Sequence, residues 1–468
     1  MTAADQIIYR YPQPSHLEQS PGQARLALTS SGGTEEHPFF FSGTVKQPAV
    51  VAQGLLLLAR VARTRFYVPP NALAGVLRAA DPVVTATDQG LRLESFSACC
   101  GVYARLDVDA AALDIAQLRS GVTNVDVNPP LRQALAALVP GNSLKLDVGT
   151  DHLQVRADDQ RIIEEKVPLP SRWLKGFAET QMLCSQMALH HELRGASLRQ
   201  FVQALPRSSV TRSVMWATGA RGADGGTRAL RLASSPAQGA VCLAGPERLR
   251  VIEPLLRFAT ALRAYGSAAE PTSPPLPSAW VLELPGARLT LALSPEKARG
   301  FSGEGSLLHL LAMGDAQEDA DFVASLLNLE ARIDIADLAR RALLPESQVS
   351  AALAVLASSG QVGFDLHSGC FFHRPLPLQP ELLLSLHPRL SEAHKLVAQA
   401  AVTAKGTGRF EVQSGPQRYE VQQIDTDEQA AQYRCNCPWF IKYQGLRGPC
   451  KHVLAVRLFL DPLQVNGA

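Results

Sequence analysis

Three cysteines and one histidine near the C-terminal end of the sequence have the types and spacing of metal ligands. Cys435 and Cys437 are separated by one residue, and so are Cys450 and His452, with twelve residues between the two pairs. Three thiolates and one imidazole make a tetrahedral ligand set that suits Zn²⁺, with Zn–S bonds of about 2.3 Å. Because four protein ligands leave no open coordination position, the sequence predicts one structural zinc ion and not a hydrolytic centre.

The flanking segments indicate how the two ligand pairs are held. Residues 409–412 and 419–423 alternate polar and apolar side chains around a Ser-Gly-Pro turn, which predicts a β-hairpin leading to the first pair. Apolar side chains dominate residues 453–459 and Pro462 follows, which predicts a short buried helix carrying the second pair. The alternative is that these cysteines are core residues that lie close together by chance. Two pairs with the same one-residue spacing, bounded by Pro and Gly, argue against it.

This stretch resembles the SWIM zinc finger, whose pattern is Cys-x-Cys, a variable spacer and then Cys-x-His. The resemblance includes the preceding hairpin and the following helix. SWIM modules are associated with both DNA binding and protein binding, so the resemblance does not choose between these two functions.

The predicted zinc module is basic and aromatic. Residues 429–460 contain five Lys or Arg and no Asp or Glu, and the zinc site itself contributes −1, so the formal charge is about +4. Basic and aromatic side chains together favour contact with phosphates and stacking on bases. The alternative is that the aromatic residues form the core of a small module, and Tyr433 and Phe440 fit that role best. The residues expected to contact nucleic acid are Arg434, Trp439, Lys442, Tyr443, Arg447 and Lys451.

The whole chain has the composition of a globular protein without a strong overall charge. Its 468 residues include 45 Lys or Arg, 43 Asp or Glu and 46% hydrophobic residues. So balanced a charge excludes a basic nucleic-acid coat, and any such binding must come from a local patch. The start has no basic segment followed by an apolar run, and no stretch can span a bilayer. Since the five cysteines outside the zinc set show no disulfide spacing, we expect a reduced cytoplasmic protein without membrane association.

The pattern of elements predicts a multidomain α+β protein. The expected parts are a flexible arm at 1–36, α+β domains at 37–180 and 181–310, a winged-helix-like domain at 320–376 and the zinc module at 379–468.

A helix followed by a strand meander repeats four times in the N-terminal region. The repeated pattern resembles the half-domain of a DNA sliding clamp, so that four units would make two clamp-like domains. An ordinary pair of antiparallel α+β domains would give the same pattern. The four helices are expected to begin at Pro70, Pro130, Ala196 and Pro246.

Residues 321–374 predict three helices and a β-hairpin, an arrangement that resembles a winged helix, a common DNA-reading fold. The helix in the position of a recognition helix carries no Arg or Lys. Since base and phosphate contacts both favour basic side chains, we expect a protein-contact or spacer module instead of a DNA reader. The positions expected to be exposed on this helix are Glu346, Ser347, Gln348, Ser350 and Ala351.

The sequence contains none of the common catalytic motifs. It has no P-loop, no Gly-x-Gly-x-x-Gly, no Gly-x-Ser-x-Gly and no His-Glu-x-x-His. The pair Cys99 and Cys100 invites a nucleophile or redox hypothesis, but a strand turning at Gly101 with one cysteine directed inward explains the same residues. His190 and His191 lack further ligands at metal spacing and fit a strand with one exposed histidine. We therefore expect that the protein is not an enzyme.

Four further segments, at 81–85, 96–107, 121–126 and 172–177, are distinctive. With them the whole chain is similar to bacterial SWIM zinc finger proteins of the kind found beside MoxR-type AAA ATPases and von Willebrand A-domain (vWA) proteins. The resemblance implies a cytoplasmic binding component that works with an ATPase and a vWA-domain partner. Two functions are therefore considered: a non-catalytic zinc protein whose SWIM module binds nucleic acid, DNA more than RNA, or alternatively an adaptor in such an assembly without nucleic-acid binding.

Overall fold

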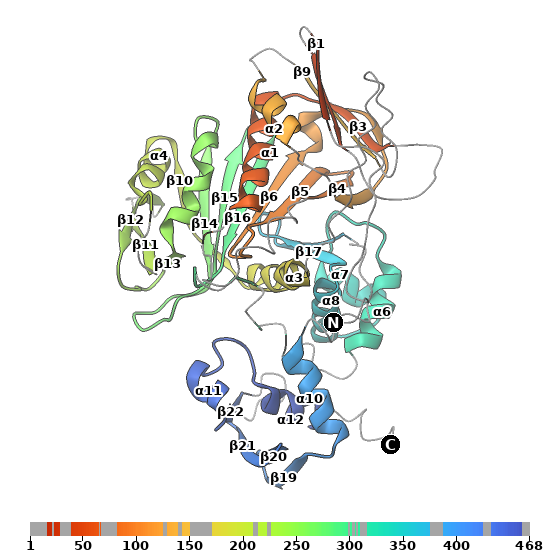
Figure 1. Ribbon diagram of the computed structural model, residues 1–468, viewed down its shortest axis with the longest axis vertical. Coiled ribbons are helices and arrows are strands. Elements are labelled where there is room, and N and C mark those ends of the chain that lie inside the picture. The colour runs from red at the N-terminus through yellow and green to blue at the C-terminus, as the bar shows by residue number, and fades with distance from the viewer. Residues whose placement is uncertain are drawn as a thin grey trace. The chain divides into compact units, whose positions relative to one another are not determined.

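A computed structural model groups the chain into two compact units, both of mixed helix and sheet (Figure 1). Unit 1 comprises Met1–Gly176, Cys184–Phe301 and Leu366–Ser368, and unit 2 comprises the rest. In the described part of the chain, no helix has the length and apolar character needed to cross a membrane. The structure describes residues 16–20, 23–28, 39–64, 66, 82–124, 129–138, 143–149, 171–208, 214–221, 226–297, 300–301, 305, 308, 316–374, 387–424 and 432–460.

The core of unit 1 is an eight-stranded sheet in which every neighbouring pair is antiparallel. Its central strands are buried along nearly their whole length, which accounts for their runs of Val, Leu and Ala. The strand order is β10 (Ala188–Arg194), β14 (Ala261–Gly266), β15 (Ser278–Leu284), β16 (Ala287–Leu293), β6 (Val102–Asp109), β5 (Gly90–Phe96), β4 (Val83–Thr87) and β8 (Gly121–Asn124).

Helix α1 (Pro48–Arg63) packs on β5 and β6 of this sheet (Figure 1). Pro48 stands at its first position, where a missing N–H costs nothing. The approach to the sheet is close at Gly54, because a Cβ there would lie 2.7 Å from the Leu106 side chain of β6. Helix α2 (Pro129–Ala136) and the 3₁₀ helix η3 (Pro246–Leu255) also pack against α1.

Two smaller sheets complete unit 1. The three-stranded sheet has the order β12 (Thr227–Ala233), β11 (Val214–Arg221) and β13 (Val241–Ala244), with α4 (Gly195–Ala204) against β12. The five-stranded sheet has the order β1 (His16–Ser20), β2 (Gln23–Leu28), β9 (Ser143–Gly149), β3 (Phe39–Val45) and β7 (Leu113–Leu118), with the 3₁₀ turn η2 (Ala110–Ala112) before β7.

Part of the predicted N-terminal arm is sheet in the structure. Strand β2 runs parallel to β9, from Gln23 beside Ser143 to Leu28 beside Val148. The prediction of a flexible arm is wrong for this segment, because an edge of β9, more than a hundred residues later in the chain, provides hydrogen-bond partners for β2. Patterns within a single sequence do not show a pairing between such distant residues. The rest of the predicted arm lies outside the described residues.

The strands of the third predicted repeat occur as β11, β12 and β13, and the last two strands of the fourth occur as β15 and β16. The fourth repeat differs in two ways. Its helix is η3, a 3₁₀ helix containing Pro254, and strand β14 lies between that helix and β15, where the sequence indicated no strand. The helix predicted from Pro70 and the part of the second repeat's strand meander that falls at residues 150–170 lie outside the described residues.

The first part of unit 2 contains the elements expected of residues 321–374. They are α6 (Ala316–Leu326), α7 (Ile335–Ala342), α8 (Glu346–Ser358) and the hairpin of β17 (Val362–Asp365) and β18 (Cys370–His373). Only the first turn of α8 is well exposed, and Ala351, which we expected on its exposed face, is buried. A helix covered in this way fits a spacer or protein-contact module better than a DNA reader, and the winged-helix resemblance stays a prediction.

The last part of unit 2 combines helices with a four-stranded antiparallel sheet (Figure 1). Helix α10 (Pro388–Ala398) packs against α12 (Lys451–Leu460), and α12 in turn contacts all four strands. The sheet order is β19 (Val402–Gly406), β20 (Arg409–Ser414), β21 (Gln417–Gln423) and β22 (Tyr433–Cys435), and the short helix α11 (Pro438–Tyr443) follows.

Candidate metal centre

Each of the four predicted zinc ligands stands at the end of an element. Cys435 ends β22 and pairs with Val421 of β21, so the first ligand lies on a strand next to the hairpin predicted from the sequence. Cys437 is the N-cap of α11, and its Sγ accepts a hydrogen bond from Phe440 N at 3.4 Å. Cys450 directly precedes α12 and accepts from Val453 N at 3.5 Å. Backbone donors of this kind favour the thiolate form that binds a metal.

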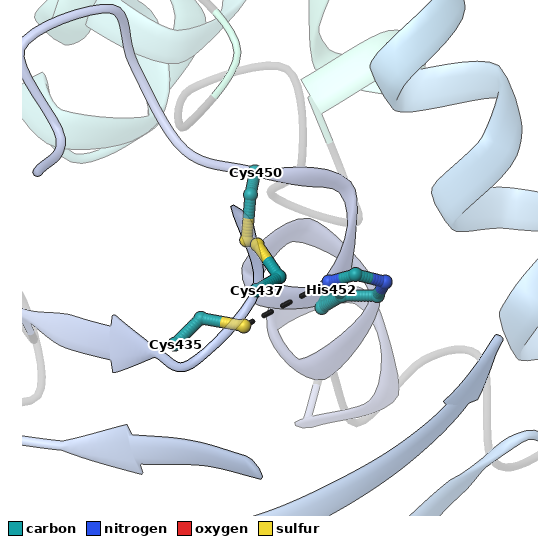
Figure 2. Close-up of side chains that lie close together, drawn as sticks. All are labelled: Cys435, Cys437, Cys450 and His452. Carbon is teal, nitrogen blue, oxygen red and sulfur yellow. Dashed lines mark hydrogen bonds between the residues drawn. The ribbon is translucent and has the colours of Figure 1, made fainter. Parts of the chain in front are cut away.

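The structure brings all four side chains together (Figure 2). Their ligand atoms lie within 4.8 Å of one another, and all four residues are buried. Cys435 Sγ lies 3.7 Å from His452 Nδ1. Tetrahedral Zn–S bonds of about 2.3 Å place sulfur ligands about 3.8 Å apart, so these four residues fit a zinc ion.

The orientation of His452 is set by packing. Its ring stacks on Tyr419 of β21 with the centroids 4.2 Å apart. Nδ1 faces Cys435, while Nε2 is buried and has no hydrogen-bond partner among the described residues. Metal-binding histidines usually fix their orientation by donating the second ring N–H, so here the stack on Tyr419 performs that positioning.

Without a cation, the thiols in this cluster titrate against one another. Hydrogen bonds to Cys437 and Cys450 favour the protonated form of Cys435 and raise its pKa. Hydrogen bonds from Cys435 and Cys450 favour the thiolate of Cys437 and lower its pKa. A divalent cation would let all three thiols ionise, because it supplies the charge that the buried thiolates lack.

A comparison with known families agrees with this geometry. The family model for the SWIM zinc finger matches residues 419–458. The chain contains a SWIM zinc finger. The match begins in β21 and includes the four clustered residues, so the resemblance seen in the sequence is confirmed for this part of the chain.

Two solved structures similar to this chain are of proliferating cellular nuclear antigen or contain it. The proliferating cellular nuclear antigen (PCNA) of Entamoeba histolytica is 12% identical and covers 55% of this chain and 98% of its own, with a TM-score of 0.31. The second structure is of the C-terminal region of FEN-1 bound to A. fulgidus PCNA. It is 7% identical, and the match covers 54% of this chain and 97% of the other chain, with a TM-score of 0.33. We draw no conclusion about fold or function from TM-scores this low. The clamp-like pairing of repeats stays a prediction. No curated protein matches the chain.

In the SWIM zinc finger, two guanidinium groups lie over the indole ring of Trp439, one of them from outside the matched residues. The Arg389 and Arg447 guanidinium carbons are 4.6 and 4.9 Å from the Trp439 ring centroid, and Arg447 is also 4.7 Å from that of Tyr443. Arg389, on α10, donates to the carbonyl oxygens of Arg447 at 2.7 Å and Pro449 at 2.9 Å. We call Arg389, Trp439, Tyr443 and Arg447 the arginine–aromatic stack.

The sequence indicated three members of this stack but not Arg389. It stands 50 positions before Trp439 and outside the matched finger, and no local signal could have identified it. Trp439 is half-buried, and its indole N–H is buried. The predicted base-stacking residue is therefore already engaged by side chains of the protein itself.

The other residues predicted to contact nucleic acid differ in their surroundings. Arg434 and Lys442 are exposed, with Lys442 Nζ 5.1 Å from the Tyr443 ring centroid. Lys451 Nζ lies 3.9 Å from Glu392 of α10.

Two exposed apolar residues of this module were not predicted from the sequence. They are Ile441 and Leu446, whose exposed fractions are 63% and 62%. Exposed apolar residues beside basic ones are a feature of many binding surfaces.

Two other candidate clusters have structural surroundings. His191 in β10 contacts Thr227 Oγ1 and the Gly239 carbonyl oxygen, and His190 contacts the Gly266 carbonyl oxygen. Cys100 is buried with a positive φ of 53°, and the Cys99 Sγ lies 3.4 Å from Ser97 Oγ, at the turn before β6. These contacts hold strand ends and turns in place.

Proposed function

We propose that this chain is a non-catalytic zinc-binding protein whose SWIM zinc finger binds nucleic acid, DNA more than RNA, through its phosphates. The observation that carries the proposal is the charge of the module. Residues 429–460 contain no carboxylate, and Arg434 and Lys442 are exposed there. Such a local patch on a chain of nearly balanced charge attracts a polyanion by releasing its counterions.

The arginine–aromatic stack favours phosphate contact over base stacking. Arg447 is held over two rings, so its side chain loses little further freedom when it meets an anion. Trp439 would have to leave the guanidinium groups of Arg389 and Arg447 before it could stack on a base. We therefore expect binding that is strongly dependent on salt and weakly dependent on sequence.

The test is a salt series of DNA binding with the zinc-loaded full-length protein. The double variant Arg434→Ala/Lys442→Ala removes two exposed charges, and Arg409→Ala, on β20, removes one exposed charge outside the matched finger. A log-log slope that becomes shallower by about 2 in the double variant, with little change in the control, supports the proposal. No binding at low salt by zinc-loaded wild-type protein would refute it.

A second candidate function is a protein adaptor in an ATPase and vWA-domain assembly without nucleic-acid binding. The exposed Ile441 and Leu446 favour it, because apolar side chains gain most from a protein partner. The test is co-purification with a MoxR-type ATPase and a vWA-domain protein after nuclease treatment. Loss of the complex in Ile441→Ser/Leu446→Ser, with zinc content unchanged, would support the adaptor, and a nuclease-sensitive complex would argue against it.

A further inference from the structure

The loop at residues 447–450, which carries Cys450, has a neighbour from a distant part of the sequence. Gly305 is buried, belongs to the same unit 2 and lies against Gly448 of this loop. A Cβ at Gly448 would overlap the carbonyl group of Gly305, so the two backbones touch. Gly448 has a positive φ of 72°, which favours glycine, and the absence of a side chain there leaves room for this approach.

Gly305 also touches the arginine–aromatic stack. A Cβ at Gly305 would overlap the guanidinium group of Arg389 and would lie 2.8 Å from the carbonyl oxygen of Arg447. That carbonyl oxygen also accepts the 2.7 Å hydrogen bond from Arg389. Gly305, Arg389 and Arg447 therefore form one packed group, in which position 305 has room for glycine and not for a larger residue.

Gly305 stands where the chain passes from one unit to the other. Unit 1 ends here at Phe301, and this part of unit 2 begins at Ser302. Between Ser302 and α6 the structure describes Gly305 and Leu308, and both are buried. The N–H of Leu308 donates to the carbonyl oxygen of Gly305 at 3.3 Å. The connection between the units is therefore packed against the zinc finger at Gly305.

The loop that Gly305 contacts is held from two sides. Arg389 donates hydrogen bonds to the loop at the carbonyl oxygens of Arg447 and Pro449. Cys450 would bind the loop to zinc, and a four-ligand structural site fixes the backbone around its ligands. Without the ion only the first attachment remains, so the surface against which Gly305 packs depends on zinc.

We propose that the zinc-loaded loop at residues 447–450 acts as a latch that holds Gly305, and that loss of zinc releases the connection between the units. The proposal does not rest on nucleic-acid binding, because the contact lies within one chain and needs no ligand besides the zinc ion. A failure of the function proposed for the finger therefore leaves it standing.

The experiment is hydrogen exchange of the full-length protein measured by mass spectrometry, with zinc bound and after its removal by a chelator. Gly305→Val enlarges the residue at the contact and leaves all four zinc ligands in place. Gly415→Asn is the matched control, because a Cβ at this turn between β20 and β21 would meet nothing within 4 Å, and Asn tolerates its left-handed backbone. Metal analysis gives the zinc content, and peptides from β6 and β16 show that unit 1 stays folded.

We expect the peptide containing Gly305 and Leu308 to exchange at least about tenfold faster after zinc removal, and also in zinc-loaded Gly305→Val. Peptides from β6 and β16 should be unaffected, and Gly415→Asn should exchange as the wild type does. Cleavage after Glu304 by a glutamate-specific protease should be accelerated in the same two samples, which gives a second measurement.

Coupling between two sites acts in both directions. Zinc should therefore leave Gly305→Val faster than it leaves Gly415→Asn when a chelator is added. The proposal is overturned if zinc removal leaves the exchange of the Gly305 peptide unchanged, or if Gly305→Val exchanges at this peptide as the wild type does.

Discussion

Removal of the Arg389 side chain should loosen the loop that carries Cys450. Its guanidinium group makes two hydrogen bonds to carbonyl oxygens of that loop, at 2.7 and 2.9 Å, and lies over the Trp439 ring. Hydrogen bonds from a charged group contribute about 1.5–3 kcal/mol each when buried, and a cation–π contact about 0.5–1 kcal/mol. Arg389 is only half-buried, so water can replace part of these interactions in the variant. We therefore expect Arg389→Ala to lower the free energy of opening this loop by about 3 kcal/mol.

A loss of about 3 kcal/mol makes opening of the loop about a hundred times more frequent. If zinc leaves through that opening, transfer of zinc to a chromogenic chelator should be accelerated by a similar factor. Arg389→Lys keeps the charge but not the planar fork, so its rate should lie between those of Arg389→Ala and the wild type. The change in Trp439 fluorescence gives a second measurement that does not depend on the metal.

Arg409→Ala is the matched control, because Arg409 is an exposed basic residue of β20, in the sheet that α12 contacts. Its zinc release should be that of the wild type. The reasoning is refuted if Arg389→Ala releases zinc within about twofold of the wild-type rate, since the opening free energy would then be nearly unchanged.

Three further predictions concern the zinc site and the two units. Cys450→Ser should remove bound zinc, as measured by metal analysis, and unfold the finger locally, because structural zinc stabilises such a module; unchanged zinc content would show that the ligand assignment is incorrect. Burial lowers the pKa of His373, whose Nδ1 accepts a hydrogen bond from Leu329 N at 2.8 Å. The unfolded state therefore binds a proton first, so stability should fall as the pH drops below about 6.5 towards the folded-state pKa of His373; the stability of His373→Gln should fall less over the same pH range. Gly54→Ala should lower the melting temperature, at a cost of about 1–2 kcal/mol, because its Cβ would meet Leu106 in the core; a higher melting temperature would mean that helix propensity outweighs the contact.

The zinc finger could be predicted in detail because its signals are local. The predicted hairpin occurs as β20 and β21, and the predicted helix after His452 is part of α12. Few other residue patterns have the Cys-x-Cys and Cys-x-His spacing that zinc binding requires here. The SWIM zinc finger could therefore be named from the sequence.

What the sequence did not reveal depends on contacts between distant residues. Strand β14 begins at Ala261 and lies between β10 and β15, yet the sequence indicated no strand there. Trp439 stood out as a base-stacking candidate because nothing near it shows that Arg389 lies over its ring. Both features need the packed structure, since neither is encoded by periodicity or by spacing.

The pairing of β6 with β16 has a consequence for any dissection of this protein. The two strands pair from Val102 beside Leu293 to Val108 beside Ala287, although they belong to predicted domains separated near residue 180. A proteolytic or recombinant fragment ending there would uncover a long, apolar strand edge on each half. Such edges recruit other chains, so the isolated halves should aggregate unless they are produced together and reassociate.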